Sequence, residues 1–280
     1  MDHTKFKLAG VMGYPILQSR SPILHNHWLA HYGLKGAYGH FQVEPQNLEA
    51  AIRGLSALGL AGCNISLPHK VEALKLMDVV DPVAQRMGAI NCIVVQDDGS
   101  LHGFNNDGYG YIQSLKDVKP DWRADAGPVV VLGAGGAARA VVLSLIDEGA
   151  REIRLTNRSI DKAQALAAGL EAVVKVVPWA ERNAAMDGAA LLVNTTNQGM
   201  YGQPPLDIRL DALPLSAMVS DLIYIPLETP LLEAARLRGH QTVNGLGMLL
   251  NQAVPAFEAW FGVKPEITGE LRQAILATFQ

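Results

Sequence analysis

Residues 129–140 read VVVLGAGGAARA, which is four apolar residues, a glycine-rich turn and the start of a helical segment. An unbroken apolar run is typical of a strand that is buried on both faces of a parallel sheet. Gly133 permits a tight turn, Gly135 lets the backbone approach a pyrophosphate, and Ala138 lets the helix pack closely on the sheet. The stretch therefore predicts a dinucleotide site. The alternative is a glycine-rich turn that binds no ligand.

The segments after this stretch alternate between helix and strand. Residues 137–148 have helical spacing, residues 152–156 form the next apolar strand, and the alternation continues to Val243. This pattern predicts a parallel, doubly wound sheet, so residues 108–245 are expected to form a Rossmann cofactor domain.

The end of the second strand of this domain indicates which dinucleotide is bound. Asn157, Arg158 and Ser159 stand there, and Lys162 follows one helical turn later. An NAD site usually has an acidic residue at this place, whereas an arginine suits the 2′-phosphate of NADP. Asp161 is close by, but acidic residues are favoured in the first turn of any helix. We therefore predict NADP; the alternative is a solvated surface arginine.

The residues before this domain predict a second α/β domain over residues 1–107. Strands are expected at 7–13, 38–43 and 62–67, helices at 23–32 and 47–58, and a hairpin over 91–104. The fold class is thus α/β with two domains, the first a mostly parallel sheet flanked by helices. One long helix is expected over 246–261, in a segment (246–280) that returns to the first domain and brings Gln252 to a cleft between the domains.

Composition and charge narrow the functional class. The 280 residues are 49% hydrophobic and 18% charged, which is typical of a globular chain with two cores. The net charge of −4 gives no reason to expect nucleic acid or an anionic membrane as a partner. Residues 1–7 lack a signal-peptide run, no apolar stretch reaches membrane-spanning length, and Cys63 and Cys92 are too few for a disulfide scaffold. We expect a cytoplasmic monomer or homodimer that acts on a small molecule.

Polar residues follow the strands predicted in the first domain. Ser19 and Ser21 suit a carboxylate, although helix capping explains them better when they are taken alone. Lys70 suits an acid/base role, but most lysines are simply exposed. Asn105-Asn106-Asp107 is more often a turn than a site. The eight histidines are scattered, and His25 and His27 do not share a helix face, so no metal site is expected.

In their order along the chain, these stretches resemble the shikimate dehydrogenase family over nearly the whole length. The resemblance implies reversible, NADP-dependent oxidation of shikimate to 3-dehydroshikimate, in the route to chorismate and the aromatic amino acids. The matching stretches include Gly13-Tyr14-Pro15, Ser19-Arg20-Ser21-Pro22, residues 64–70, Gly88-Ala89-Ile90-Asn91, Asn105-Asn106-Asp107, residues 133–140, Asn157-Arg158-Ser159, residues 194–200, residues 221–226 and Gly247-Met248-Leu249.

The resemblance also implies a role for individual positions. Lys70 and Asp107 are similar to the family's catalytic pair. The positions expected to bind substrate are Ser19, Ser21, Asn64, Ser66, Asn91, Asn106, Tyr224 and Gln252. The positions expected to bind the cofactor are Gly133, Gly135, Gly136, Ala137, Asn157, Arg158, Ser159, Lys162, Asn194, Thr195, Gly245 and Met248.

Four positions depart from the family pattern. Gln18 stands in place of a histidine, and Ser66, Cys92 and Asn106 each stand in place of a threonine. The neighbours of the expected catalytic pair are thus changed, which leaves quinate or a related hydroxy or amino acid as an alternative substrate. The alternative that is not an enzyme is a catalytically silent regulator that binds a dinucleotide. The retention of Lys70 and Asp107 argues against this alternative.

Overall fold

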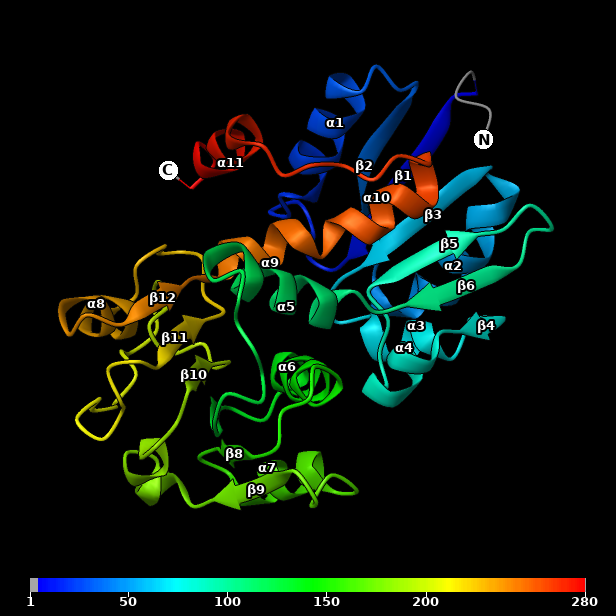
Figure 1. Ribbon diagram of the computed structural model, residues 1–280. Coiled ribbons are helices and arrows are strands. Elements are labelled where there is room, and N and C mark those ends of the chain that lie inside the picture. Colours follow the sequence, from blue (N-terminus) through cyan, green and yellow to red (C-terminus); the bar gives the residue numbers. More distant parts are fainter. Residues whose placement is uncertain (1–4, 280) are drawn as a thin grey trace. The chain divides into compact units, whose positions relative to one another are not determined.

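The structure is a computed structural model that describes residues 5–279, and the chain forms two compact units. Unit 1 contains the residues up to Asn106 together with those from Gln252 onward, and unit 2 spans Asp107–Asn251. Each unit is built on one six-stranded sheet with helices packed on it (Figure 1). The predicted α/β fold with two sheets is confirmed.

The sheet of unit 1 has the strand order β2-β1-β3-β5-β6-β4. β1 is parallel to both β2 and β3, β4 is parallel to β6, and β5 is antiparallel to both β3 and β6. The sheet is therefore mostly parallel, and the predicted hairpin is the β5–β6 pair. The strands are β1 (Lys7–Gly13), β2 (Gly36–Gln42), β3 (Leu60–Ile65), β4 (Val79–Val80), β5 (Cys92–Val95) and β6 (Leu101–Phe104).

Helices cover both faces of this sheet. On one face, α2 (Leu48–Ala57) buries Leu48, Ile52 and Leu55, which recur at helical spacing, against β1 and β3. On the other face lie α1 (Ser21–His31) and α10 (Ala253–Phe261), which also pack against each other (Figure 1). The remaining helices of the unit are η1 (Pro45–Asn47), α3 (Lys70–Leu74), α4 (Pro82–Met87) and α11 (Gly269–Leu276).

The single long helix predicted over 246–261 is wrong. The structure has two helices there, α9 (Gly245–Asn251) in unit 2 and α10 in unit 1, with Gln252 between them. Pro255 supplies the physical reason. A proline has no backbone N–H for the carbonyl four residues earlier, here that of Asn251, and its ring crowds that carbonyl.

The sheet of unit 2 is parallel throughout and has the order β12-β11-β10-β7-β8-β9. Numbered from its first strand, this is the Rossmann order, so the doubly wound prediction is confirmed. The strands are β7 (Val129–Leu132), β8 (Ile153–Thr156), β9 (Val174–Val177), β10 (Leu191–Asn194), β11 (Met218–Asp221) and β12 (Gln241–Val243). The helices besides α9 are α5 (Asp107–Val118), α6 (Gly136–Asp147), α7 (Ile160–Ala167), α8 (Pro230–Leu237), η2 (Trp179–Glu181) and η3 (Ala184–Met186).

The residues of β7 alternate between two hydrophobic cores. Val129 and Val131 belong to one core cluster, whereas Val130 and Leu132 belong to the other. The strand is thus buried on both faces, as its unbroken apolar run predicts. Among the described residues 5–279, no helix combines the length and the apolar character needed to cross a membrane.

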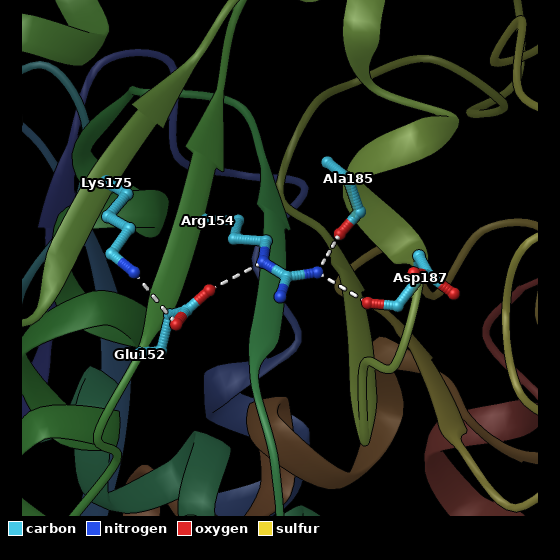
Figure 2. A network of polar contacts seen from close by, with 5 residues as sticks. All are labelled: Glu152, Arg154, Lys175, Ala185 and Asp187. Carbon is cyan, nitrogen blue, oxygen red and sulfur yellow. Dashed lines mark hydrogen bonds and ion pairs between the residues drawn. The ribbon is translucent and has the colours of Figure 1, made fainter.

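A polar network joins β8 and β9 to the chain around η3 (Figure 2). Arg154 Nε donates to Glu152 Oε1 at 2.7 Å, and Lys175 Nζ donates to Glu152 Oε2 at 3.0 Å. Arg154 Nη1 donates to the carbonyl oxygens of Ala185 at 2.8 Å and Asp187 at 2.6 Å. The Arg154 and Lys175 side chains hold the pKa of Glu152 below its usual value.

We expect Arg154→Met to lower the free energy of unfolding by about 1–3 kcal/mol, because it leaves two carbonyls and one carboxylate without this donor. Urea denaturation measures the change. Arg151→Ala is the control, because Arg151 is 82% exposed and lies 3.6 Å from Asp125. In the folded state the pKa of Glu152 is lowered, so the ionised Glu152 carboxylate contributes to the stability of the fold. This contribution is fully present above the unfolded-state pKa and is lost as the pH falls through the folded-state pKa. Equal midpoints for the two variants at neutral pH would contradict the role given to Arg154.

Candidate active site

Two serine hydroxyls meet in the loop after β1. Ser19 Oγ lies 3.2 Å from Ser21 Oγ and also accepts a hydrogen bond from the Ser21 N–H at 3.3 Å. His40 Nε2 lies 3.0 Å from the Ser19 carbonyl oxygen and holds the loop against β2. The N-cap residue of α1 is Arg20, whose side chain makes no capping hydrogen bond. Ser19 Oγ instead meets the N–H of the first helical residue and also stands beside the Ser21 hydroxyl, so the pair of hydroxyls can serve an anionic group as well.

A chain of buried amides links four segments of unit 1. Tyr38 Oη donates to Asn64 Oδ1 at 2.6 Å, and Asn64 Nδ2 donates to the Asn91 carbonyl at 2.9 Å. Asn91 Oδ1 then accepts from the N–H of Asn106 at 2.9 Å. Burial raises the pKa of Tyr38, so its phenol stays a neutral donor. Three predicted site residues are thus held together, and Tyr38, which sequence reasoning missed, fixes the first of them.

Lys70 and Asp107 each begin a helix. Lys70 is the first residue of α3, it is partly buried, and its carbonyl accepts from the Ile90 N–H at 3.0 Å. The preceding residue, His69, is buried and places its Nε2 2.8 Å from the Val43 carbonyl oxygen. Asp107 is the first residue of α5 and directly follows Asn106, whose backbone Asn91 holds. Both titratable side chains therefore extend from anchored backbone.

The departures at Ser66 and Cys92 differ in their surroundings. Ser66 is partly exposed after β3, and its N–H donates to the Met12 carbonyl at 2.8 Å. Cys92 is 1% exposed in β5, and burial raises the pKa of its thiol. The change at position 92 therefore lies in the core of the sheet, where a thiol packs as a small apolar group.

The glycine turn of unit 2 leaves open space at the start of α6. Gly133 has a φ of +109°, and a Cβ there would lie 2.5 Å from Thr195 Oγ1. At Gly135 and Gly136, by contrast, a Cβ would meet no atom within 4 Å. Gly135 is the N-cap of α6 and provides no side-chain cap, so the first N–H groups of the helix remain available to a ligand.

A cavity of about 210 Å³ opens beside this turn. Arg158 and Asn157 line it after β8, and Trp179 lines it after β9. Asn157 Nδ2 donates to the Ser159 carbonyl at 2.8 Å, and Lys162 is exposed on the first turn of α7. The lining thus combines the glycine turn that leads into α6 with an arginine, which fits a phosphorylated ligand. Sequence reasoning missed Trp179, although an aromatic residue just past a strand end was a usable signal.

Two neighbouring residues at the end of β10 point in different directions, Thr195 to the cavity and Asn194 to the interior. Thr195 lines the cavity, and its Oγ1 donates to the Leu132 carbonyl at 2.7 Å. Asn194 is fully buried: its Nδ2 donates to Asp221 Oδ1 at 3.0 Å, and its Oδ1 accepts from Thr196 Oγ1 at 2.7 Å. Burial raises the pKa of Asp221. The Asn194 side chain therefore holds the loop after β10 through these hydrogen bonds and does not line the cavity.

The remaining predicted positions lie after β11 or in the last helices. Gly245 begins α9 and packs so closely that a Cβ would lie 2.0 Å from the Leu222 carbonyl oxygen. Met248 packs against the hydrophobic core of unit 2. Tyr224 belongs to the same unit, whereas Gln252 belongs to unit 1.

Comparison with known proteins gives matches along the chain. Residues 11–93 match the shikimate dehydrogenase substrate binding domain, residues 118–201 match shikimate / quinate 5-dehydrogenase, and residues 245–276 match the shikimate 5′-dehydrogenase C-terminal domain. A shikimate dehydrogenase (NADP(+)) of Rhodospirillum rubrum is 53% identical over 276 residues, which cover 97% of this chain and 98% of the relative.

Two solved structures are also similar over nearly their whole length. The shikimate 5-dehydrogenase of Thermus thermophilus in complex with NADP(H) and shikimate is 33% identical with a TM-score of 0.86, and the match covers 97% of this chain and 99% of that one. The quinate dehydrogenase of Corynebacterium glutamicum in complex with NAD is 30% identical with a TM-score of 0.90, and the match covers 98% and 100% of the two chains.

Proposed function

The chain belongs to the shikimate dehydrogenase family, and we propose that it catalyses the reversible, NADP-dependent oxidation of shikimate to 3-dehydroshikimate. The 53% identical relative that carries this activity in its name matches nearly from end to end. The structural observation that carries the cofactor assignment is that Arg158 and the glycine turn line one cavity. The proposal includes a cytoplasmic monomer or homodimer, and the two free, buried cysteines suit a reducing compartment.

The residues around this cavity fit NADP. Gly135 and Gly136 leave room for the pyrophosphate at the N-terminus of α6, and Arg158 offers a planar donor for the 2′-phosphate. Ser159 and Lys162 follow on the same loop and helix and would complete the phosphate site. When bound, NADP supplies the nicotinamide that exchanges hydride with the substrate carbon.

We assign the proton transfer to Lys70. In the oxidation, its neutral amine takes the proton of the substrate hydroxyl while hydride leaves the carbon that bears this hydroxyl; in the reduction, its ammonium returns the proton to the forming alkoxide. Asp107 would hydrogen-bond the same hydroxyl and orient it for the proton transfer. Both roles follow the family resemblance, and the anchored backbone at the starts of α3 and α5 supports them.

We assign the binding of the substrate to polar side chains at the ends of the unit 1 strands. Ser19 and Ser21 would donate to the carboxylate, because their hydroxyls stand together at a fixed spacing. The Tyr38–Asn64–Asn91 chain would hold the amides that bind ring hydroxyls, so that little ordering remains to be done when substrate arrives. Ser66, Tyr224 and Gln252 are assigned to the same ligand by resemblance.

Initial rates with shikimate and quinate, each with NADP+ and NAD+, test the proposal. We expect the highest kcat/KM for shikimate with NADP+. A higher value for quinate with NAD+ would replace the substrate and cofactor assignment. Binding of NADP without turnover of either acid would favour the silent regulator. Quinate is the second candidate because a quinate dehydrogenase shares the fold at a TM-score of 0.90, and because Ser66 and Asn106 depart from the family pattern.

We expect Asn106→Thr to raise kcat/KM for shikimate about fivefold or more. The asparagine brings a two-proton amide next to Asp107, and a polar group left unpaired in a closed site costs about 1–3 kcal/mol. The Asn91 side chain holds the backbone N–H of position 106, which a threonine also provides, so the exchange should leave the loop in place. Quinate assayed side by side is the control. A fall in kcat/KM, in a wild type that is already fast, would show that Asn106 belongs to an efficient shikimate site.

A further inference from the structure

Arg20 lies between the two serines, yet its guanidinium is bound to the segment after α11. Its Nε donates to Thr278 Oγ1 at 3.3 Å, and its Nη2 donates to the Thr278 carbonyl oxygen at 3.0 Å. Its Nη1 donates to the carbonyl oxygen of Gln18 in its own loop. The ring of Phe279 lies 5.9 Å from the guanidinium carbon. All three nitrogens of the guanidinium are therefore engaged by the protein.

The segment that receives Arg20 is firmly held. The N–H and Oγ1 of Thr278 both donate to the Ile275 carbonyl oxygen, at 3.0 and 2.7 Å. Ile275 and Leu271 are fully buried, and α11 packs against α1. The Thr268 hydroxyl caps the start of α11 by accepting from the Leu271 N–H at 3.2 Å. Thr278 thus extends from a capped and docked helix, and the position it offers to Arg20 is fixed.

The loop that carries the serines is also held by hydrogen bonds within itself and to β2. The Ser19 N–H donates to the Ile16 carbonyl at 2.9 Å, and His40 holds the Ser19 carbonyl from the side of β2. Arg20 adds an attachment from the loop to the residues after α11. A loop that is ordered before the ligand arrives loses less conformational entropy when it binds. Loss of the Arg20 attachment would therefore weaken the binding of the ligand that the two serines hold.

We propose that Arg20 and Thr278 form a brace that holds the Ser19–Ser21 loop ready for the carboxylate of the substrate. Arg20 is a positioning residue in this role, since its donors point to Thr278 and Gln18. The inference rests on the proposed function, because it takes the two serines as the carboxylate site. The brace acts on the substrate equally before and during hydride transfer, so its loss should raise KM and leave kcat nearly unchanged.

Steady-state kinetics of Arg20→Ala provide the first test. Hydrogen bonds from a charged donor are worth about 1.5 kcal/mol, so we expect KM for shikimate to rise about tenfold, with kcat and KM for NADP+ nearly unchanged. An analogue with a hydroxymethyl group in place of the carboxylate should show no such rise. Arg53→Ala is the matched control, because Arg53 is a half-exposed arginine of the same unit, 3.8 Å from Asp78. An unchanged KM, or an equal loss with the analogue, would overturn the brace.

Thr278→Val separates the brace from direct contact between Arg20 and substrate. The valine removes the oxygen that accepts from Nε, so KM for shikimate should rise, and the double variant should be little worse than Arg20→Ala alone. Independent, additive effects, or no effect of Thr278→Val, would overturn the part of the brace that runs through the Thr278 hydroxyl. Hydrogen exchange at Ser19 should also quicken in Arg20→Ala, and unchanged exchange contradicts the brace. If the wild type oxidises no shikimate, the proposed function fails, whereas hydrogen exchange still decides the brace.

Discussion

Lys70→Ala is expected to lower kcat for shikimate oxidation by about 10²–10⁴-fold, the usual contribution of a positioned acid or base. The fold should survive the change, because an alanine keeps the backbone carbonyl at position 70 and leaves the His69 ring contact in place. Thermal unfolding should therefore be unchanged while turnover falls. Lys75→Ala is the matched control, since Lys75 closely follows α3 and pairs with Glu72 at 2.8 Å on the surface. Near-normal turnover in Lys70→Ala would defeat the mechanism.

Asp107→Asn shows whether the two side chains act as a unit. If Asp107 works through the hydroxyl that Lys70 deprotonates, the double variant should be little worse than Lys70→Ala alone. Multiplied losses would give the two residues independent roles. The amide is close in shape to the carboxylate, so α5 should still begin at this residue, and a lower kcat with an unchanged melting temperature would report on charge alone.

The local patterns of the sequence predict the frame of the fold because each depends on neighbours in the chain. The run from Val129 to Leu132 is buried on both faces, and the glycine turn follows directly, so strand, turn and helix come from one stretch. The break between α9 and α10 also has a local cause, Pro255, and attention to this proline would have corrected the single long helix.

Local sequence patterns do not predict the contacts of the candidate site, because these contacts join residues that are far apart in the chain. Tyr38 bonds Asn64 across the single strand β1 that separates their strands, and Arg20 bonds Thr278, which is 258 residues away in the chain. Asn194 turns inward because Asp221, on the next strand, accepts its amide. The sequence could indicate which polar residues follow strands, but the partner of each side chain depends on the order of strands in the sheet.

Arg158→Ala is expected to weaken NADP+ about 10- to 150-fold and to change NAD+ little. Only NADP+ carries the 2′-phosphate, and hydrogen bonds to a charged group contribute about 1.5–3 kcal/mol. Arg158 is exposed at the cavity, so removal of its side chain should not disturb β8. The dependence of KM for NADP+ on ionic strength should also become weaker, because screening acts on the lost charge pair.

Trp179→Leu is the matched control for Arg158→Ala, because it changes the same cavity without removing a charge. Trp179 lines the same cavity, and it is an uncharged ring that offers no ion pair to the 2′-phosphate. Its loss should therefore weaken NADP+ and NAD+ to the same degree, through contacts that both cofactors can make. Initial rates with each cofactor, at saturating shikimate, measure both variants. If Arg158→Ala weakened the two cofactors equally, as Trp179→Leu should, the arginine would be only part of the cavity wall, and the preference for NADP+ would need another source.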